Sequence, residues 1–291
     1  MFHGSIVALV TPMDGDGRID YVSLQRLVDF HLQAGTDGIV VAGTTGESAT
    51  LAEHEYNKLL TRVIEQAGSR MVVIAGTGSP DTATAITRTQ VAADLGADGA
   101  LVVTPYYNRP VQSGLLAHYN ALADNTQIPL VLYNVPSRTA VDMLPETVAE
   151  LAQRDEIVAI KEAVPDMDRI RSLTALCGKS LVVLSGDDQS CCAAMRLGAK
   201  GVVSVAANVV PGLFRELCGF AADENWPEAV EIDDSLRHLY ELLALETNPI
   251  PVKWVLYKLA LTGNGIRLPL LSLDKRFHEK MMLGLKQLSL V

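Results

Sequence analysis

The chain has 291 residues, of which 48% are hydrophobic, and a net charge of −10. This length and apolar content fit one large α/β barrel or two ordinary domains and exclude a disordered chain. The acidic excess argues against binding to nucleic acid or to anionic membranes. The sequence has no signal-peptide pattern, no apolar run of membrane-spanning length, and no CxxC or metal spacing among its four cysteines. We therefore expect a cytoplasmic protein.

Short β-branched apolar runs alternate with helical patterns along most of the chain. Eight strands are predicted, at residues 5–10, 38–42, 71–75, 99–103, 129–133, 157–161, 181–185 and 201–204. A helical pattern follows each of them. Strands that are apolar almost throughout are typical of a parallel sheet covered by helices.

One junction between a helix and the next strand recurs at residues 34–40, 95–101 and 197–203. In each copy a glycine ends the helix, a short polar turn follows, and a second glycine opens the strand. Three copies favour a (β/α)8 TIM barrel. The alternative is a doubly wound sheet. That fold would prefer a glycine-rich nucleotide fingerprint after the first strand, where this chain has Thr11-Pro12-Met13.

The pattern from Pro211 to Leu288 is helical throughout and too long for a single closing helix. It predicts about three additional C-terminal helices beside the barrel, and Asn248-Pro249-Ile250-Pro251 marks the entry to one of them. We therefore expect a barrel catalytic domain at residues 1–210 and a helical extension packed on it at residues 211–291.

The carboxyl ends of the strands form the active-site face of such a barrel. In this chain they carry hydroxyls, tyrosines, one arginine and one lysine, and none of the six histidines. Metal-dependent aldolases and hydrolases need ligands such as histidine there, so we expect no metal.

Lys161 ends the apolar run 157–160. A charged ammonium group after four apolar residues is costly to desolvate, and a neutral lysine is an amine nucleophile that forms imines with carbonyl substrates. Tyr133, one strand away, can exchange protons through its phenol. The Thr44-Thr45 turn suits a substrate carboxylate. The guanidinium of Arg138 can bind a second carboxylate through two hydrogen bonds. The structural alternatives are a strand-ending lysine, a packed tyrosine, a tight turn and a surface arginine.

Four strings together resemble the dihydrodipicolinate synthase family of imine-forming, class I aldolase-type enzymes, which is related to N-acetylneuraminate lyase. They are GTTGES at 43–48, TPYY at 104–107, YNVPSRT at 133–139 and IKE at 160–162, and the resemblance covers essentially the whole chain. It implies that Lys161 forms an imine with pyruvate, which then adds to L-aspartate 4-semialdehyde in lysine and diaminopimelate biosynthesis. No cofactor beyond this covalent imine is implied.

The same resemblance implies roles for further residues. Tyr133, Thr44 and Tyr107 form a proton relay, with Tyr107 reaching into the neighbouring subunit's site. Thr45 holds the pyruvate carboxylate and Arg138 that of the semialdehyde. Backbone groups of Gly186 and Val203 line the pocket. Members of the family are commonly homotetramers built as dimers of dimers.

The chain departs from the family where lysine-inhibited members bind their effector. Those members have two histidines, an asparagine and a glutamate at the positions of Glu53, Tyr56, Pro80 and Thr84. Three other positions of that possible effector site, Ser48, Ala49 and Tyr106, are retained. The sequence therefore predicts weak or absent inhibition by lysine.

Two other functions remain open. One is a pyruvate-dependent lyase for sugar-derived 2-keto acids, although a neutral polyol aldehyde needs no arginine fork such as Arg138. The other is a non-catalytic, carboxylate-binding barrel, which would form no imine.

Overall fold

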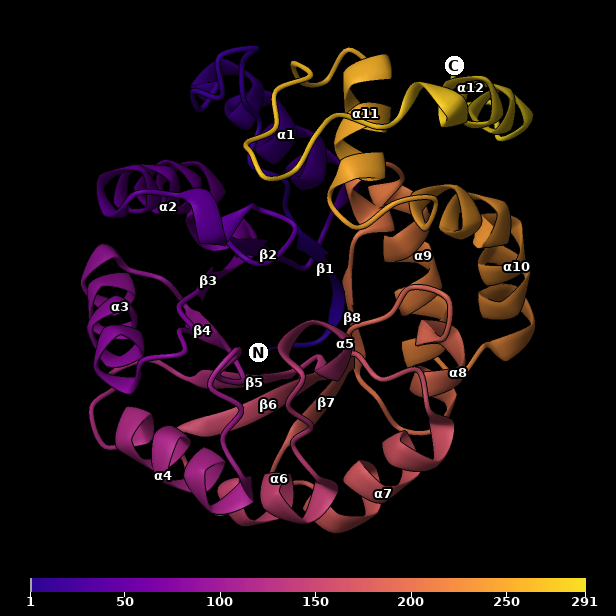
Figure 1. Ribbon diagram of the computed structural model, residues 1–291. Coiled ribbons are helices and arrows are strands. Elements are labelled where there is room, and N and C mark those ends of the chain that lie inside the picture. Colours follow the sequence, from indigo (N-terminus) through magenta and orange to yellow (C-terminus); the bar gives the residue numbers. More distant parts are fainter. Residues whose placement is uncertain (1) are drawn as a thin grey trace.

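The computed structural model describes residues 2–291. Within them, eight parallel strands form a closed barrel in which each strand pairs with the next and the last pairs with the first (Figure 1). The strands are β1 (Gly4–Ala8), β2 (Gly38–Val41), β3 (Val72–Gly76), β4 (Gly99–Val103), β5 (Leu130–Asn134), β6 (Ile157–Glu162), β7 (Val182–Ser185) and β8 (Gly201–Ser204). Closure confirms the predicted TIM barrel and rules out the doubly wound sheet.

A ring of helices surrounds the barrel (Figure 1). It consists of α1 (Tyr21–Ala34), α2 (Glu53–Ala67), α3 (Thr82–Leu95), α4 (Gln112–Ala123), α6 (Pro145–Leu151), α7 (Met167–Cys177), α8 (Cys191–Arg196) and α9 (Pro211–Ala222). The single turn α5 (Pro136–Thr139) directly follows β5. Short 3-10 turns lie at η1 (Ser48–Thr50), η2 (Gly68–Arg70), η3 (Ala206–Asn208) and η4 (Lys275–Phe277).

The recurring junction has the geometry that its glycines predict. Gly35 and Gly96 cap α1 and α3 in the left-handed conformation, at φ 73° and 92°. Gly198, shortly after α8, has φ 107°. Residues with a β-carbon rarely adopt these angles, so glycine lets the chain leave each helix and enter the next strand directly.

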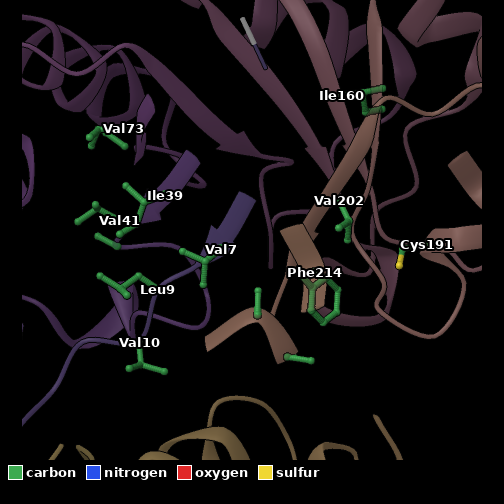
Figure 2. Close-up of a cluster of buried hydrophobic side chains, with 14 of the residues drawn as sticks. Val7, Leu9, Val10, Ile39, Val41, Val73, Ile160, Cys191, Val202 and Phe214 are labelled. Atoms are coloured by element: carbon green, nitrogen blue, oxygen red, sulfur yellow. The ribbon is translucent and has the colours of Figure 1, made fainter. Parts of the chain in front are cut away.

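Alternating side chains of the strands build two apolar layers. One lies between the barrel and the helices and includes Val7, Ile39 and Ile160 of the strands and Phe214 of α9 (Figure 2). The other fills the barrel itself and includes Ala159 and Tyr133. Because side chains alternate along a strand, Lys161 lies on the same inner face as Ala159, whereas Ile160 and Glu162 face the helices.

Three further helices follow α9, namely α10 (Trp226–Leu243), α11 (Ile250–Lys258) and α12 (His278–Gln287). Residues 259–274, which the sequence pattern assigns to helix, are irregular instead. They contain Gly263, Gly265 and Pro269, and the backbone at Gly265 passes so close to the carbonyl of Asp14 that any β-carbon would clash. Of residues 2–291, none belongs to a helix long and apolar enough to cross a membrane.

Candidate active site

Lys161 and Tyr133 lie side by side at the carboxyl ends of adjacent strands. They are register partners in the β5–β6 pair, and Nζ of Lys161 lies 4.3 Å from the centroid of the Tyr133 ring. Each residue is only 6% exposed. An amine and a phenol in this arrangement can exchange protons with a carbonyl compound bound between them.

Gly186, just after β7, gives the lysine side chain its room. A β-carbon on Gly186 would lie 3.0 Å from Cγ and Cε of Lys161 and 2.8 Å from the β-carbon of Ala163. The glycine therefore borders the nucleophile directly. Val203 of β8 is buried in the same inner layer as Tyr133.

The turn after β2 brings hydroxyls and N–H groups to the barrel mouth. Its internal hydrogen bonds run from the N–H groups of Gly46 and Ser48 to the carbonyl of Gly43, and from that of Glu47 to the carbonyl of Thr44. The N–H groups of Thr44 and Thr45 take no part in these bonds. Thr44 lines a small cavity together with Tyr133. Free donors beside a nucleophile can hold a carboxylate.

Arg138 projects from α5 and is exposed, and its guanidinium donates to the carbonyl oxygen of Asn248 over 3.2 Å. The side-chain amide of Asn248 also donates to Oγ1 of Thr45 over 2.9 Å. One residue of the C-terminal extension therefore contacts both groups that were expected to bind carboxylates. The sequence marked Asn248 only as part of a helix entry, because no local pattern indicates a contact with residues 110 and 203 positions away.

A buried ion pair supports the same turn. Lys253 of α11 contacts Glu47, and their side chains are 4% and 1% exposed. Glu47 has φ 56°, and its second carboxylate oxygen accepts the N–H of Arg267 over 3.0 Å. Burial lowers the pKa of Lys253, whereas the Glu47 carboxylate opposes this shift. Sequence reasoning missed this pair, since no local pattern links two residues that are 206 positions apart.

Tyr107 does not join the other catalytic candidates within one chain. It is 94% exposed, at φ 71°, and the preceding Tyr106 is 37% exposed. The structure therefore places Tyr107 on the surface of its own chain and not beside Lys161 and Tyr133.

The possible effector residues are spread over three segments, and two of these residues line the same cavity as Thr44 and Tyr133. Ser48 and Tyr56 line the cavity with Arg88, which pairs with Glu53 over 2.6 Å. Burial raises the pKa of Tyr56, whose hydroxyl has no hydrogen-bond partner within residues 2–291. Pro80 and Thr84 lie at the start of α3, and the side chain of Thr84 donates to Asp81. Ala49 and Tyr106 are exposed.

Carboxylates near the barrel mouth have backbone partners. Asp188 accepts the N–H groups of Val205 and Ala206, and Asp187 accepts that of Ser190. Nowhere in residues 2–291 do three His, Cys, Asp or Glu residues gather in a group that could hold a metal ion.

Comparisons with known proteins agree with this geometry. The model of the Dihydrodipicolinate synthetase family matches residues 1–288. The chain belongs to this family. Its relatives include the 4-hydroxy-tetrahydrodipicolinate synthase of Nitrosococcus oceani, which is 50% identical over 99% of this chain and 98% of that protein. Membership of the dihydrodipicolinate synthetase family confirms the resemblance drawn from the four strings.

Solved structures of the family superpose closely on this chain. The chloride-inhibited dihydrodipicolinate synthase from Acinetobacter baumannii, complexed with pyruvate, gives a TM-score of 0.99 at 43% identity, and each chain is covered completely. The enzyme from Cyanidioschyzon merolae with lysine bound gives 0.96 at 36% identity, over 100% of this chain and 99% of that one.

Proposed function

We propose that this protein condenses pyruvate with L-aspartate 4-semialdehyde to give 4-hydroxy-tetrahydrodipicolinate, a step of lysine and diaminopimelate biosynthesis. The names of its relatives support this activity. The observation that carries the proposal is the buried amine of Lys161, 4.3 Å from the centroid of the Tyr133 ring in the mouth of a closed barrel.

The chemistry follows from these side chains. The unprotonated amine of Lys161 attacks the keto carbon of pyruvate, and loss of water gives a protonated imine. Loss of a methyl proton then gives an enamine, whose carbon adds to the aldehyde carbon of the second substrate. Finally, the amino group of that substrate attacks the imine carbon, releases the lysine and closes the ring. The imine itself accepts the electrons, so the proposed reaction needs no metal or other cofactor.

Neighbouring groups serve this sequence. Tyr133 and Thr44 carry protons to and from the pyruvate oxygen and carbon, and Thr45 holds the pyruvate carboxylate with its N–H and hydroxyl. Arg138 binds the carboxylate of the semialdehyde, and this fork favours an amino-acid aldehyde over a sugar-derived one. Gly186 and Val203 shape the pocket around the nucleophile.

The proposal extends to assembly and location. We infer a homotetramer built as a dimer of dimers, which is the assembly that the family resemblance implies. The 94% exposure of Tyr107, outside its own site, supports contact with at least one further subunit. A cytoplasmic location suits the four buried cysteines, each of them a free thiol.

Borohydride reduction in the presence of pyruvate tests the proposed function. Mass spectrometry is expected to find the reduced adduct on Lys161 and to lose it in Lys161→Arg, since a guanidinium stays protonated. Lys200→Arg, a change at an exposed lysine, serves as the matched control and is expected to label normally. An adduct on Lys200 or Lys253 instead, or a labelled enzyme that does not consume L-aspartate 4-semialdehyde, would contradict the proposal.

A further inference from the structure

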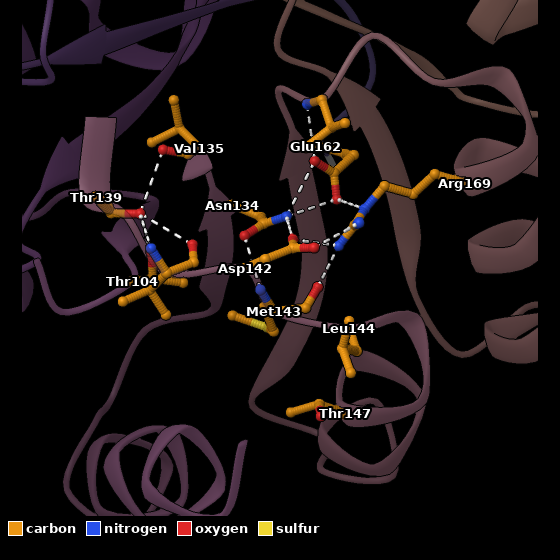
Figure 3. Close-up of polar contacts among 12 residues, drawn as sticks. Thr104, Asn134, Val135, Thr139, Asp142, Met143, Leu144, Thr147, Glu162 and Arg169 are labelled. Atoms are coloured by element: carbon orange, nitrogen blue, oxygen red, sulfur yellow. Dashed lines mark hydrogen bonds and ion pairs between the residues drawn. The ribbon is translucent and has the colours of Figure 1, made fainter. Parts of the chain in front are cut away.

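We propose that Glu162, together with Asn134 and Arg169, positions both the nucleophile and the arginine-bearing turn from outside the barrel. Glu162 touches no substrate, and its effect passes through Lys161 and Arg138. The inference therefore rests on the function proposed for those two residues. Three observations carry it, namely the strand register, the closure of a loop and the burial of charge (Figure 3).

The register places a structural pair directly beside the reacting pair. Tyr133 pairs with Lys161 in the β5–β6 ladder, and the next step pairs Asn134 with Glu162. Because side chains alternate, the first pair faces the barrel and the second faces the helices. The amide of Asn134 donates to both carboxylate oxygens of Glu162, over 3.1 and 3.0 Å. This link fixes the two strands one residue beyond the nucleophile.

Asn134 also closes the loop that carries Arg138. Its amide donates to Asp142 over 3.0 Å, and its side-chain oxygen accepts the N–H of Met143 over 3.0 Å. The chain thus leaves β5 at Asn134, forms the turn with Arg138 and returns to the same side chain. Figure 3 shows Asn134 between Glu162 on one side and Asp142 with Met143 on the other.

Arg169 of α7 completes the cluster. Its Nε donates to Glu162 over 2.8 Å and its NH1 to Asp142 over 3.0 Å, so it bridges the two carboxylates. The side chain of Glu162 is 0% exposed and that of Arg169 is 11% exposed. The N–H of Val164 supplies one more donor to Glu162 over 2.9 Å. The buried charge is therefore paired and hydrogen-bonded on several sides.

Stability alone does not account for such a cluster. Apolar residues of similar volume often replace a buried ion pair without loss of stability. Apolar side chains, however, have no directional bonds with which to hold Asn134, Asp142 and the end of β6 in one arrangement. Displacing a reacting group by about 1 Å can cost about a hundred-fold in rate, so a device that fixes Lys161 and Arg138 together has a catalytic use.

Glu162→Gln tests the inference, and Glu156→Gln is its matched control. Glu156 precedes β6, at the opposite end from Glu162, and pairs with Arg154 over 3.1 Å. We expect Glu162→Gln to slow pyruvate imine trapping and kcat by about ten-fold or more and to raise the KM for the semialdehyde. Glu156→Gln is expected to leave the trapping rate, kcat and the semialdehyde KM within about two-fold of their wild-type values. Trapping rates are referred to folded protein, so a loss of stability alone does not change them.

Asp142→Ala tests the contacts of the cluster with the arginine-bearing loop separately from those with the end of β6. Asp142 belongs to the arginine-bearing loop, and its side chain, 40% exposed, accepts from Asn134 and Arg169 and makes no direct bond to β6 within residues 2–291. Its loss is therefore expected to raise the semialdehyde KM while imine trapping stays normal. Should Glu162→Gln not fold, Glu162→Leu/Arg169→Leu replaces it, because that pair leaves no lone buried charge.

The inference is overturned if a folded Glu162 variant traps pyruvate and uses the semialdehyde as the wild type does. It is likewise overturned if Asp142→Ala slows trapping as much as it raises the KM. Failure of wild-type protein to trap pyruvate on Lys161 would instead contradict the proposed function.

Discussion

Arg138 differs from the other site residues in its exposure. Lys161, Tyr133 and Thr45 are all buried, whereas Arg138 is exposed and, within residues 2–291, is bonded only to the backbone carbonyl of Asn248. Its guanidinium therefore retains donors that face solvent and are free for a ligand. We therefore propose that Arg138 selects the second substrate without taking part in imine formation.

Arg138→Ala is expected to weaken use of L-aspartate 4-semialdehyde and to leave pyruvate trapping nearly unchanged. Loss of one charge-assisted carboxylate contact costs about 2–4 kcal/mol, which is about 30- to 1000-fold in kcat/KM for that substrate. Steady-state kinetics with both substrates varied measures it, and Ser137→Ala on the same turn serves as the control. Equal damage to pyruvate trapping would show that Arg138 acts on the first substrate instead.

The residues found from sequence share one property. Lys161, Tyr133, Thr44 and Arg138 all lie at or just after the end of a strand, where the fold itself indicates the active-site face. Asn248, in the C-terminal extension, contacts Arg138 and Thr45, and it lies 203 residues from Thr45 in the sequence. Such a long-range contact produces no periodicity or local motif in the sequence, so it could be found only in the folded chain.

At the scale of elements, the C-terminal extension stabilises the turn after β2. Lys253 of α11 pairs with Glu47, while Asn248, just before α11, holds Thr45. Glu47 has a left-handed backbone that residues other than glycine adopt at some cost, so its contacts must hold it there. The extension thus maintains the shape of the turn after β2.

Lys253→Met is expected to destabilise the protein by about 3–5 kcal/mol, because it leaves the Glu47 carboxylate buried without its cation. Urea denaturation measures the change in the free energy of unfolding. Lys280→Met, at an exposed lysine of α12, is the control and should stay within about 0.5 kcal/mol.

Adding Glu47→Gln to Lys253→Met should recover part of the loss, because it removes the lone buried charge and keeps an acceptor for the N–H of Arg267. A double variant less stable than Lys253→Met would contradict a dominant role for that charge.

The sequence predicted elements best where one junction recurred. Gly35, Gly96 and Gly198 adopt the positive φ angles that their pattern requires, and the eight strands lie within two residues of their predicted limits. The prediction was wrong at residues 259–274, where apolar spacing resembled a helix. There the close approach of Gly265 to Asp14 determines the backbone conformation, and the spacing of apolar residues does not predict such a contact. The division of the chain at residue 210 stays a prediction.

At the scale of the whole molecule, we propose that Tyr107 links catalysis to assembly. Mixing the inactive variants Tyr107→Phe and Lys161→Ala is expected to restore activity through sites that draw one intact residue from each chain. Half of randomly formed dimers are mixed and each has one intact site of two, so recovery should approach about one quarter of wild-type activity. Mixed dimers verified by mass spectrometry that remain inactive would place the whole relay within one chain.

Regulation belongs to the same scale, because a lysine effector must couple its own site to the barrel mouth. Lysine needs acceptors for its ammonium groups and donors for its carboxylate. Here Glu53 is already neutralised by Arg88 at 2.6 Å, Thr84 donates to Asp81, and Pro80 has no side-chain amide. Each lost contact with a charged group costs about 1.5–3 kcal/mol, or about 10- to 100-fold in affinity.

We therefore expect weak or no inhibition by lysine. Initial rates against lysine, with pyruvate near its KM, measure it. Pro80→Asn/Thr84→Glu restores an amide and a carboxylate at the start of α3 and is expected to raise sensitivity at least about ten-fold, whereas Thr87→Glu on the exposed face of the same helix should not. Half-inhibition of the wild type well below about one millimolar would show that Tyr56, Ser48 and their neighbours bind lysine without those groups.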